Sequence, residues 1–253
     1  INFRYDLILQ LKKEGYEIVC SASEDNKEVA RKLEKLGVNF IPIRMDRNSI
    51  SIVSDLRYTF KLIKLLYKER PTHLISYTVK PVIFGGLARM FYFKKCRVSN
   101  LITGLGQYGN EPVNKKGKLV QLVITLLYRF TLSLTDVIFF QNEDDKQLFK
   151  QKGITKRQRE LITPGSGINL ERFSTTSPSY DPIRFLLVAR LLKSKGIEFY
   201  LEAAQSLKAI YGNKVAFQLI GQKDELSADA ISDSLLETAV NDGSIEYLGF
   251  RKM

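Results

Sequence analysis

Two cations and a glycine follow a short apolar run in the second half of the sequence. In the stretch VARLLKSKG, Arg190 lies two residues after the end of the run RFLLV, and Lys195 and Gly196 precede the helical pattern IEFYLEAAQSLKAI. A run such as RFLLV is typical of a buried parallel strand. The carboxyl end of that strand and the start of the next helix form a crevice that favours anions. The sequence therefore predicts a diphosphate site here; the alternative is that Lys193 and Lys195 are solvated loop charges.

Strand-like and helix-like segments alternate along the chain and would position these residues. Predicted strands lie at residues 16–22, 38–43, 73–77, 97–102 and 136–140, and predicted helices at 26–37, 55–70, 81–91, 119–134 and from 143 onwards. After residue 182 the alternation restarts, with strands at 183–189, 214–221 and 244–250. Such alternation predicts an α/β fold with parallel sheets and helices on both faces.

The segment most typical of a linker is STTSPSYDP, at residues 174–182. The charge balance changes at the same place, because residues 1–180 contain 30 Lys and Arg against 17 Asp and Glu, whereas residues 181–253 contain 9 against 10. We therefore predict one domain at residues 1–180 and a second at 181–253. The basic first domain is expected to face an anionic partner: a lipid surface, a phosphate-bearing substrate or nucleic acid.

Both ends of the sequence are expected to be incomplete. The chain starts at Ile1 on a helix-like segment, whereas a doubly wound domain normally begins with a strand and a glycine-rich phosphate loop. The segment after the linker is short for a second doubly wound domain. The expectation is a fragment whose first domain lacks its first strand and whose second domain is truncated.

The cysteines and the longest apolar stretch argue against secretion and membrane spanning. Cys20 and Cys96 lie in or beside apolar runs without metal-ligand spacing, so reduced cytosolic thiols are expected. The apolar stretch at residues 119–134 contains Gln121 and Arg129, and it is shorter than the roughly 20 apolar residues that a bilayer span needs. It predicts a buried or half-buried helix, one side of which is able to touch a membrane.

Seven segments occur in an order and spacing that resemble a known family. They are ISYTVKPVIFGGLA, LITGLG and DVIFFQNEDD in the first half, and PGSGINLERF, VARLLKSKGIEFYLEAA, FQLIGQKDE and IEYLGFRK in the second. Together they resemble the family 4 retaining glycosyltransferases. The first-half segments are similar to the branch that builds bacterial surface polysaccharides on a lipid carrier. The resemblance implies the GT-B fold, which has two Rossmann-like doubly wound domains.

The resemblance implies a donor site at the strand ends of the second domain. In the family, the Arg and Lys that match Arg190 and Lys195 contact the diphosphate of a nucleotide-sugar. They would be catalytic because they stabilise the charge that accumulates on the leaving diphosphate. Gly221 would let the backbone approach the nucleotide closely. Gly249 and Arg251 resemble the segment beside the base, although an ordinary turn glycine is the alternative for Gly249.

The first-half motifs imply an acceptor side. YTVKP and TGLG match loops that face the cleft between the domains, so Lys80 and the turn containing Thr103, Gly104 and Gly106 are expected to hold the acceptor or its phosphate. Backbone amides in a glycine-rich turn favour anions. For Lys80 the alternative is an ordinary surface lysine. His73, the only histidine, matches no family motif and is expected to be structural.

The function implied is that of a hexosyltransferase. It would move a sugar from a nucleotide-sugar, by family tendency UDP-linked, to a polyprenyl-diphosphate-linked or other saccharide acceptor, in capsule, O-antigen or exopolysaccharide synthesis. No metal or other cofactor is expected, since the sequence has no D-x-D pair and no cluster with ligand spacing. The family's paired-glutamate segment, which would hold the donor sugar, has no match up to Met253, so this chain alone is expected not to turn over.

Four cations are spaced to form one stripe on the predicted helix 55–70: Arg57, Lys61, Lys64 and Lys68. The stripe is expected to lie opposite apolar residues that include Leu56 and Phe60. A solvated outer face is one interpretation. The other is contact with anionic lipid, worth about 1 kcal/mol for each cation near the surface. The hypothesis is a cytoplasmic protein attached peripherally to the inner face of the cell membrane.

Two other classes of protein stay open. Nucleotide-sugar 2-epimerases share the two-domain architecture, but they need acid/base carboxylates and histidines in the cleft, and this chain has one histidine. A nucleic-acid-binding protein would fit the isoelectric point of about 9.5. However, the 15 Phe and 12 Tyr lie within apolar runs and are not interleaved with cations, and no binding motif is present, so no nucleic-acid partner is expected.

Overall fold

The structure is a computed structural model of the chain, and it describes residues 3–23, 26–45, 51–104, 115–178, 180–223, 227 and 229–251. The chain divides into two compact units, Ile1–Phe173 and Ser174–Met253. The division falls at the start of the Ser/Thr/Pro-rich segment. Each unit is built from parallel strands and helices, so the predicted α/β fold is confirmed.

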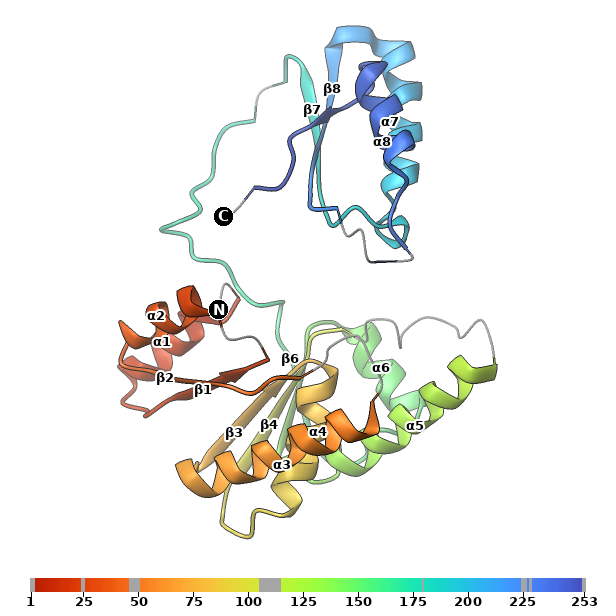
Figure 1. Cartoon of the computed structure of the whole chain (residues 1–253). Helices are drawn as coiled ribbons and strands as arrows, with labels where there is room; N and C mark the ends of the chain where they lie inside the picture. The colour runs from red at the N-terminus through yellow and green to blue at the C-terminus, as the bar shows by residue number, and fades with distance from the viewer. Residues whose placement is uncertain are drawn as a thin grey trace. The chain divides into compact units, whose positions relative to one another are not determined.

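The first unit contains two parallel sheets among its described residues (Figure 1). β1 (Val19–Ala22) pairs with β2 (Asn39–Pro42). The other sheet has the order β3-β4-β5-β6, formed by β3 (His73–Tyr77), β4 (Arg97–Ile102), β5 (Val137–Phe140) and β6 (Arg159–Ile162). Because all these pairs are parallel, the strand ends that carry the predicted acceptor-side residues share one edge of the sheet.

The described residues of the first unit form six α-helices beside these strands: α1 (Tyr5–Lys13), α2 (Lys27–Glu34), α3 (Ile52–Glu69), α4 (Val79–Met90), α5 (Lys115–Leu132) and α6 (Glu143–Gln151). Polar side chains cap several of them, as their sequences indicate. The side-chain oxygen Oδ1 of Asn26 accepts hydrogen bonds from the backbone N–H groups of Glu28 and Val29, and Oδ1 of Asn142 accepts one from the N–H of Asp145.

The core of the first unit lies between the larger sheet and helices α4, α5 and α6. Val82, Leu132, Ile138, Phe140 and Phe149 are fully buried there. The opposite side of α5 is exposed, and its apolar residues follow helical spacing: Leu119, Leu122, Val123, Leu126 and Phe130. α5 is therefore half-buried, one of the two states predicted for it.

Helix α3 differs from its prediction. Its buried side consists of Asp55, Tyr58, Thr59 and Leu66. Leu56 and Phe60 are exposed, beside the basic stripe and not opposite it, so that expectation was wrong. The apolar residues of α3 occupy more than one face of the helix, and only packing on α4 decides which of them is buried.

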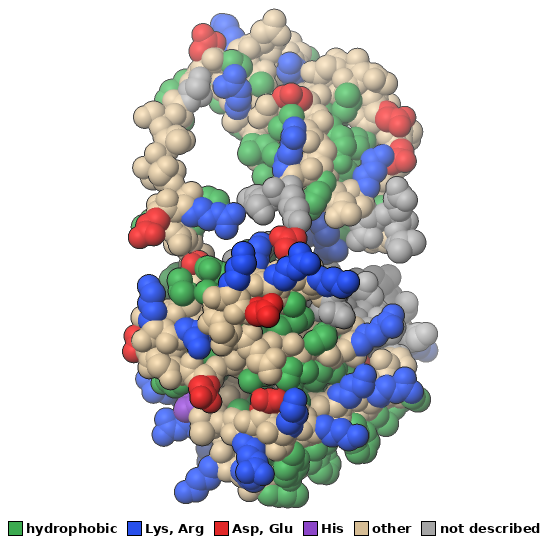
Figure 2. Space-filling view, turned by 60° about the vertical axis from the view of Figure 1, so that its left-hand side comes forward, with side chains coloured by type: hydrophobic (Ala, Val, Ile, Leu, Met, Phe, Trp, Pro, Cys, Tyr) green, Lys and Arg blue, Asp and Glu red, His purple; other side chains and the backbone are tan. Residues whose placement is uncertain are grey.

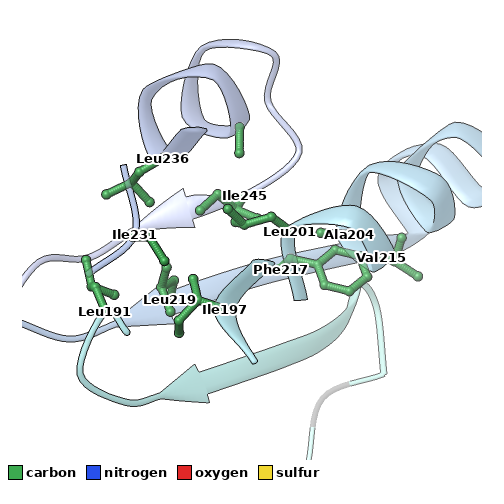
Figure 3. Close-up of a cluster of buried hydrophobic side chains, with 11 residues drawn as sticks. Leu191, Ile197, Leu201, Ala204, Val215, Phe217, Leu219, Ile231, Leu236 and Ile245 are labelled. Atoms are coloured by element: carbon green, nitrogen blue, oxygen red, sulfur yellow. The ribbon is translucent and has the colours of Figure 1, made fainter. Parts of the chain in front are cut away.

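The second unit has one parallel sheet of order β7-β8-β9 among its described residues, formed by β7 (Ile183–Val188), β8 (Val215–Ile220) and β9 (Glu246–Tyr247). Helices α7 (Ile197–Tyr211) and α8 (Asp233–Asn241) lie on the same side of it (Figure 1). Their inner faces pack on alternate residues of β8, such as Phe217 and Leu219 (Figure 3). This core fixes where the strands of the unit end.

Candidate functional site

The carboxyl ends of the three strands of the second unit are joined by backbone hydrogen bonds. The N–H of Ala189 donates to the carbonyl of Ile220 at 3.0 Å, and the N–H of Leu191 donates to Gln222 at 3.1 Å. The N–H of Gly221 donates to the carbonyl of Gly249 at 3.1 Å. The fold therefore brings the backbone around Arg190, Gly221 and Gly249 to one edge of the sheet.

Gly221 is required for a reason that the sequence did not indicate. A Cβ at this position would lie 1.9 Å from the carbonyl oxygen of Ala189, a distance that no side chain tolerates. The close approach is between the ends of two neighbouring strands. Whether Gly221 also approaches a nucleotide stays a prediction.

The turn between β7 and α7 is compact. The N–H of Leu192 donates to the carbonyl of Arg190 at 2.8 Å, and a short 3-10 helix, η2 (Lys193–Lys195), follows. Gly196 ends η2 with a φ of 73°, a conformation that favours glycine, and α7 begins at the next residue. The side chains of Arg190 and Lys195 are exposed, so the backbone is ordered while both cationic groups are accessible.

Asp229 belongs to this turn, and sequence reasoning missed it. Its carboxylate accepts hydrogen bonds from the hydroxyl and the N–H of Ser194, and its backbone carbonyl accepts one from the N–H of Lys193 at 2.8 Å. Asp229 thus connects η2 to the segment after β8 and adds a negative charge next to Ser194. The available signal was its position after β8, because loops after neighbouring parallel strands meet at one edge.

Lys223 is a further cation at this edge, and it is already engaged. Its ammonium lies 2.7 Å from the Asp233 carboxylate. The hydrogen bond to Asp233 raises the pKa of Lys223, so this lysine is protonated and its charge is balanced locally. Arg251, the other predicted cation, is exposed. It follows Gly249, whose φ of 71° supports the turn-glycine interpretation of that residue.

In the first unit, Lys80 is part of a buried ion pair. Its ammonium lies 2.8 Å from the Asp55 carboxylate, and the two side chains are only 13% and 11% exposed. Thr78, directly after β3, has a φ of 66°, which for a β-branched residue is a strained conformation of the kind that clusters at functional sites. The surface-lysine alternative for Lys80 is therefore wrong.

The rest of the predicted acceptor side is described in part. Thr103 and Gly104 follow β4 and are half-buried, and Gly104 has a φ of 104°. Gly106 lies outside the described residues. His73, the first residue of β3, is exposed at the opposite edge of the sheet, with its Nδ1 3.0 Å from the Thr72 hydroxyl.

No group of three or more His, Cys, Asp or Glu side chains is placed to hold a metal ion in the part of the chain that the structure describes. The two cysteines are not joined in a disulfide. The expectation of a metal-free site stays a prediction.

Comparison with known proteins now defines the class. The two parallel α/β units place the chain among proteins of the GT-B fold. Residues 3–142 match the family model described as glycosyl transferase 4-like, and the chain belongs to this family. A curated relative from Campylobacter jejuni, N,N'-diacetylbacillosaminyl-diphospho-undecaprenol alpha-1,3-N-acetylgalactosaminyltransferase, is 28% identical over 264 residues. That alignment covers 99% of this chain and 66% of the relative.

Solved structures agree on the fold. A glycosyltransferase from Rickettsia africae has a TM-score of 0.62 at 15% identity, covering 99% of this chain and 65% of that one. A protein from Listeria monocytogenes, described as a UDP-N-acetylglucosamine 2-epimerase, has a TM-score of 0.59 at 15% identity with the same coverage. The chain thus spans about two thirds of the length of these proteins.

Proposed function

We propose that the protein is a sugar transferase that moves a hexosyl group from a nucleotide-sugar, UDP-linked, to a lipid-linked saccharide. Membership of the glycosyl transferase 4-like family supports the transferase activity. The Campylobacter relative is named for a diphospho-undecaprenol acceptor, and this supports a polyprenyl-diphosphate carrier. Retention of the anomeric configuration and a role in capsule, O-antigen or exopolysaccharide synthesis are part of the proposal.

The observation that carries the proposal is the strand edge of the second unit. Arg190 and Lys195 are exposed there on a turn whose backbone is fixed by hydrogen bonds. When the bond from the sugar to the diphosphate breaks, negative charge grows on the leaving diphosphate. Two cations beside it would stabilise that state more than the ground state, and the ordered backbone of the turn keeps both residues at this strand end. We propose no metal and no other cofactor for this step.

On the acceptor side, we propose that Lys80 and the turn at residues 103–106 hold the acceptor phosphate. The carboxyl end of β3 is followed directly by Thr78, which has a strained backbone. α4 begins at the next residue and contains Lys80 in its first turn. Because Asp55 balances the charge of Lys80, this lysine would contribute hydrogen bonds more than net charge. The N–H groups of the α4 terminus would supply the remaining attraction for an anion.

Nucleotide binding tests the donor site directly. Titration of UDP into the protein, followed by calorimetry, is expected to show binding that Arg190→Ala weakens by about tenfold or more, since a hydrogen bond to a charged group contributes about 1.5–3 kcal/mol. Arg184→Ala is the matched control, because Arg184 is also exposed but lies near the amino end of β7. Equal affinities for both variants and the unchanged protein would contradict the proposed site.

We also propose peripheral attachment to an anionic membrane through the first unit. Exposed apolar residues of α3, such as Leu56 and Phe60, lie beside the cations of the basic stripe. α5 adds the exposed apolar residues from Leu119 to Phe130. Figure 2 shows Lys and Arg side chains next to hydrophobic ones on the surface of this unit. Among the described residues, no helix is long and apolar enough to cross a bilayer.

Flotation with liposomes tests this attachment. We expect the protein to float with vesicles that contain anionic lipid at low salt, and to be released as salt screens the cations. Replacement of Arg57 and Lys61 by Glu should abolish flotation, whereas replacement of the exposed Arg184 and Lys214 of the second unit should not. Full recovery of the unchanged protein in the soluble fraction would discard the proposal.

The position of His73 argues against the epimerase alternative. An epimerase needs general acids and bases beside the sugar. His73 lies at the amino end of β3, at the edge of the sheet opposite to the predicted site. The likeness to the Listeria protein is at 15% identity and concerns the fold alone.

A further inference from the structure

Arg4, the residue directly before α1, lies at the carboxyl edge of the larger sheet of the first unit. Its guanidinium stacks over the ring of Tyr77, the last residue of β3, at 4.3 Å. Its Nη1 donates hydrogen bonds to the Ser166 hydroxyl at 3.2 Å and to the Phe3 carbonyl at 3.3 Å. The fold therefore brings a half-buried cation to the edge at which the proposed acceptor residues lie.

Ser166 connects Arg4 to the ends of two further strands. It follows β6, and its hydroxyl oxygen also accepts a hydrogen bond from Nε2 of Gln141 at 3.2 Å. Gln141 comes directly after β5. Side chains from the ends of β3, β5 and β6 are thus joined through this one cation. We name the four residues the Arg4 cluster: Arg4, Tyr77, Gln141 and Ser166.

The Arg4 cluster has hydrogen-bond donors that the protein itself does not use. Among the described residues, Nε and Nη2 of Arg4 have no hydrogen-bond acceptor. Their N–H bonds are parallel, an arrangement that fits two oxygens of one phosphate. The oxygen of Ser166 already accepts from Arg4 and Gln141, so its O–H remains to donate. The cluster therefore offers three donors to an anion.

The charge of Arg4 is not balanced by a carboxylate in the part of the chain that the structure describes. No ion pair there involves Arg4, and the nearby Asp6 accepts a hydrogen bond from Asn169 at 3.4 Å. Arg4 also caps the amino end of α1, where the helix dipole favours anions over cations. Lys80, in contrast, is paired with Asp55 at 2.8 Å. An anionic ligand beside Arg4 would supply the missing negative charge.

From these observations we propose that the Arg4 cluster binds a phosphate group of the acceptor, in the diphosphate that joins the saccharide to its lipid carrier. Nε and Nη2 of Arg4 would donate to two phosphate oxygens, and the Ser166 hydroxyl would add a further hydrogen bond. Arg4 would supply the net positive charge that the paired Lys80 does not. This assignment rests on the proposed function, in which the acceptor is lipid-linked.

The order of the strands explains why Arg4 and Lys80 would act on the same ligand. β4 lies between β3 and β5, so the turn that begins at Thr103 leaves the sheet between Tyr77 and Gln141 of the Arg4 cluster. Lys80 follows Tyr77 by three residues. A diphosphate at this edge has two phosphate groups, and Arg4 would balance its charge while Lys80 adds hydrogen bonds.

Selectivity for the diphosphate group tests the Arg4 cluster. The probes are farnesyl diphosphate and farnesol, which share one prenyl chain and differ in the charged group, and calorimetry follows the binding of each. We expect the protein to bind the diphosphate more tightly by about tenfold or more. Arg4→Ala should remove this preference and leave the affinity for farnesol unchanged. Arg4→Lys keeps the charge without the parallel N–H bonds, so it should restore only part of the preference.

Arg159→Ala is the matched control, because Arg159 is an exposed arginine of the same sheet but begins β6, at the opposite edge. It should keep the preference of the unchanged protein. A variant that folds poorly would lose affinity for both probes, so it would not imitate the expected result. Flotation with anionic vesicles, whose phospholipid headgroups also contain phosphate, should be the same for Arg4→Ala and the unchanged protein.

Three results would overturn the proposal. In the first, the unchanged protein binds farnesyl diphosphate no more tightly than farnesol. In the second, Arg4→Ala keeps the preference, or Arg159→Ala loses it as well. In the third, Arg4→Ala loses flotation but keeps its affinity for farnesyl diphosphate, which would assign the cluster to membrane phospholipid. The proposed transferase function is tested separately, because it is contradicted by binding of UDP that Arg190→Ala does not weaken.

Discussion

The two units present their predicted cations in opposite ways. In the second unit, backbone hydrogen bonds fix the turn, and the side chains of Arg190 and Lys195 are exposed. In the first unit, the Lys80 side chain is only 13% exposed and is paired with Asp55. An exposed cation contributes little to folding. A largely buried cation compensates the charge of its partner. Its removal is therefore expected to lower the free energy of unfolding, whatever its effect on ligand binding.

The largest expected effect therefore lies in the first unit. Lys80→Ala leaves the Asp55 carboxylate buried without this partner, and we expect a loss of about 3–5 kcal/mol in the free energy of unfolding. Urea denaturation measures it. Asp55→Ala combined with Lys80→Ala should recover most of the loss, and Lys64→Ala, on the exposed side of α3, should change stability little. If Lys80→Ala were as stable as Lys64→Ala, the ion pair of Lys80 with Asp55 would not contribute to stability, and Lys80 would not differ in this respect from the exposed cations of the second unit.

Gly221→Ala is expected to have the next largest effect. The new methyl group would lie 1.9 Å from the Ala189 carbonyl oxygen, so the ends of β7 and β8 must separate, at a cost of about 1–3 kcal/mol. Thermal unfolding measures the loss. Gly249→Ala has no atom within 4 Å of the new methyl group, and its smaller penalty would come from the positive φ alone. Equal losses at both glycines would refute the steric explanation.

Asp229→Ala should lower the free energy of unfolding less than Gly221→Ala does. It tests whether the hydrogen bonds of Asp229 order the turn that carries Lys195. It removes the acceptor for both the N–H and the hydroxyl of Ser194, and we expect a loss of about 1 kcal/mol. If the turn orders Lys195 for a diphosphate, affinity for UDP should fall as well, although a negative charge has been removed. Asp229→Asn keeps one acceptor oxygen and should behave close to the unchanged protein. Tighter binding by Asp229→Ala would show that its charge matters more than its hydrogen bonds.

The smallest effect on stability is expected at Lys195. Because this side chain is exposed, Lys195→Ala should change the free energy of unfolding by less than about 0.5 kcal/mol. Binding of UDP should nevertheless weaken, with a shallower dependence on salt. Chemical denaturation and calorimetry on the same sample separate the two quantities. A clear loss of stability with unchanged binding would reverse the contrast between Lys195 and Lys80.

Much of the fold was predictable because the relevant signals are local. The period of apolar residues placed the strands and helices, and the run IRFLLV was correctly assigned to a strand followed by a turn and a helix. The prediction that this strand is buried was wrong, because β7 stands at the end of the order β7-β8-β9 among the described residues, and Phe185, Leu186 and Val188 are exposed.

Which side of α3 is buried was not predictable from its apolar residues. Ile52, Leu56 and Phe60 are exposed while Tyr58 and Thr59 are buried, because the neighbouring helix selects the face that packs.

The residues of the candidate site also differ in whether local sequence patterns predict them. The positions of Arg190, Gly196 and Gly249 follow from the strand ends, so the sequence was sufficient to find them. Asp229 and the pairing of Lys80 with Asp55 depend on segments far apart in the chain that only the fold brings together. Neither contact has a sequence pattern of its own.

By itself, the sequence determined the order of strands and helices and the places where cations follow strand ends, since each depends on neighbours within one or two helical turns. The parallel arrangement followed from the alternation of these elements along the chain. The tertiary structure alone decided which charges are balanced and at which glycine packing leaves no room for a side chain. Those properties arise from distances between remote segments. Burial and electrostatic interaction depend on such distances, and no local pattern specifies them.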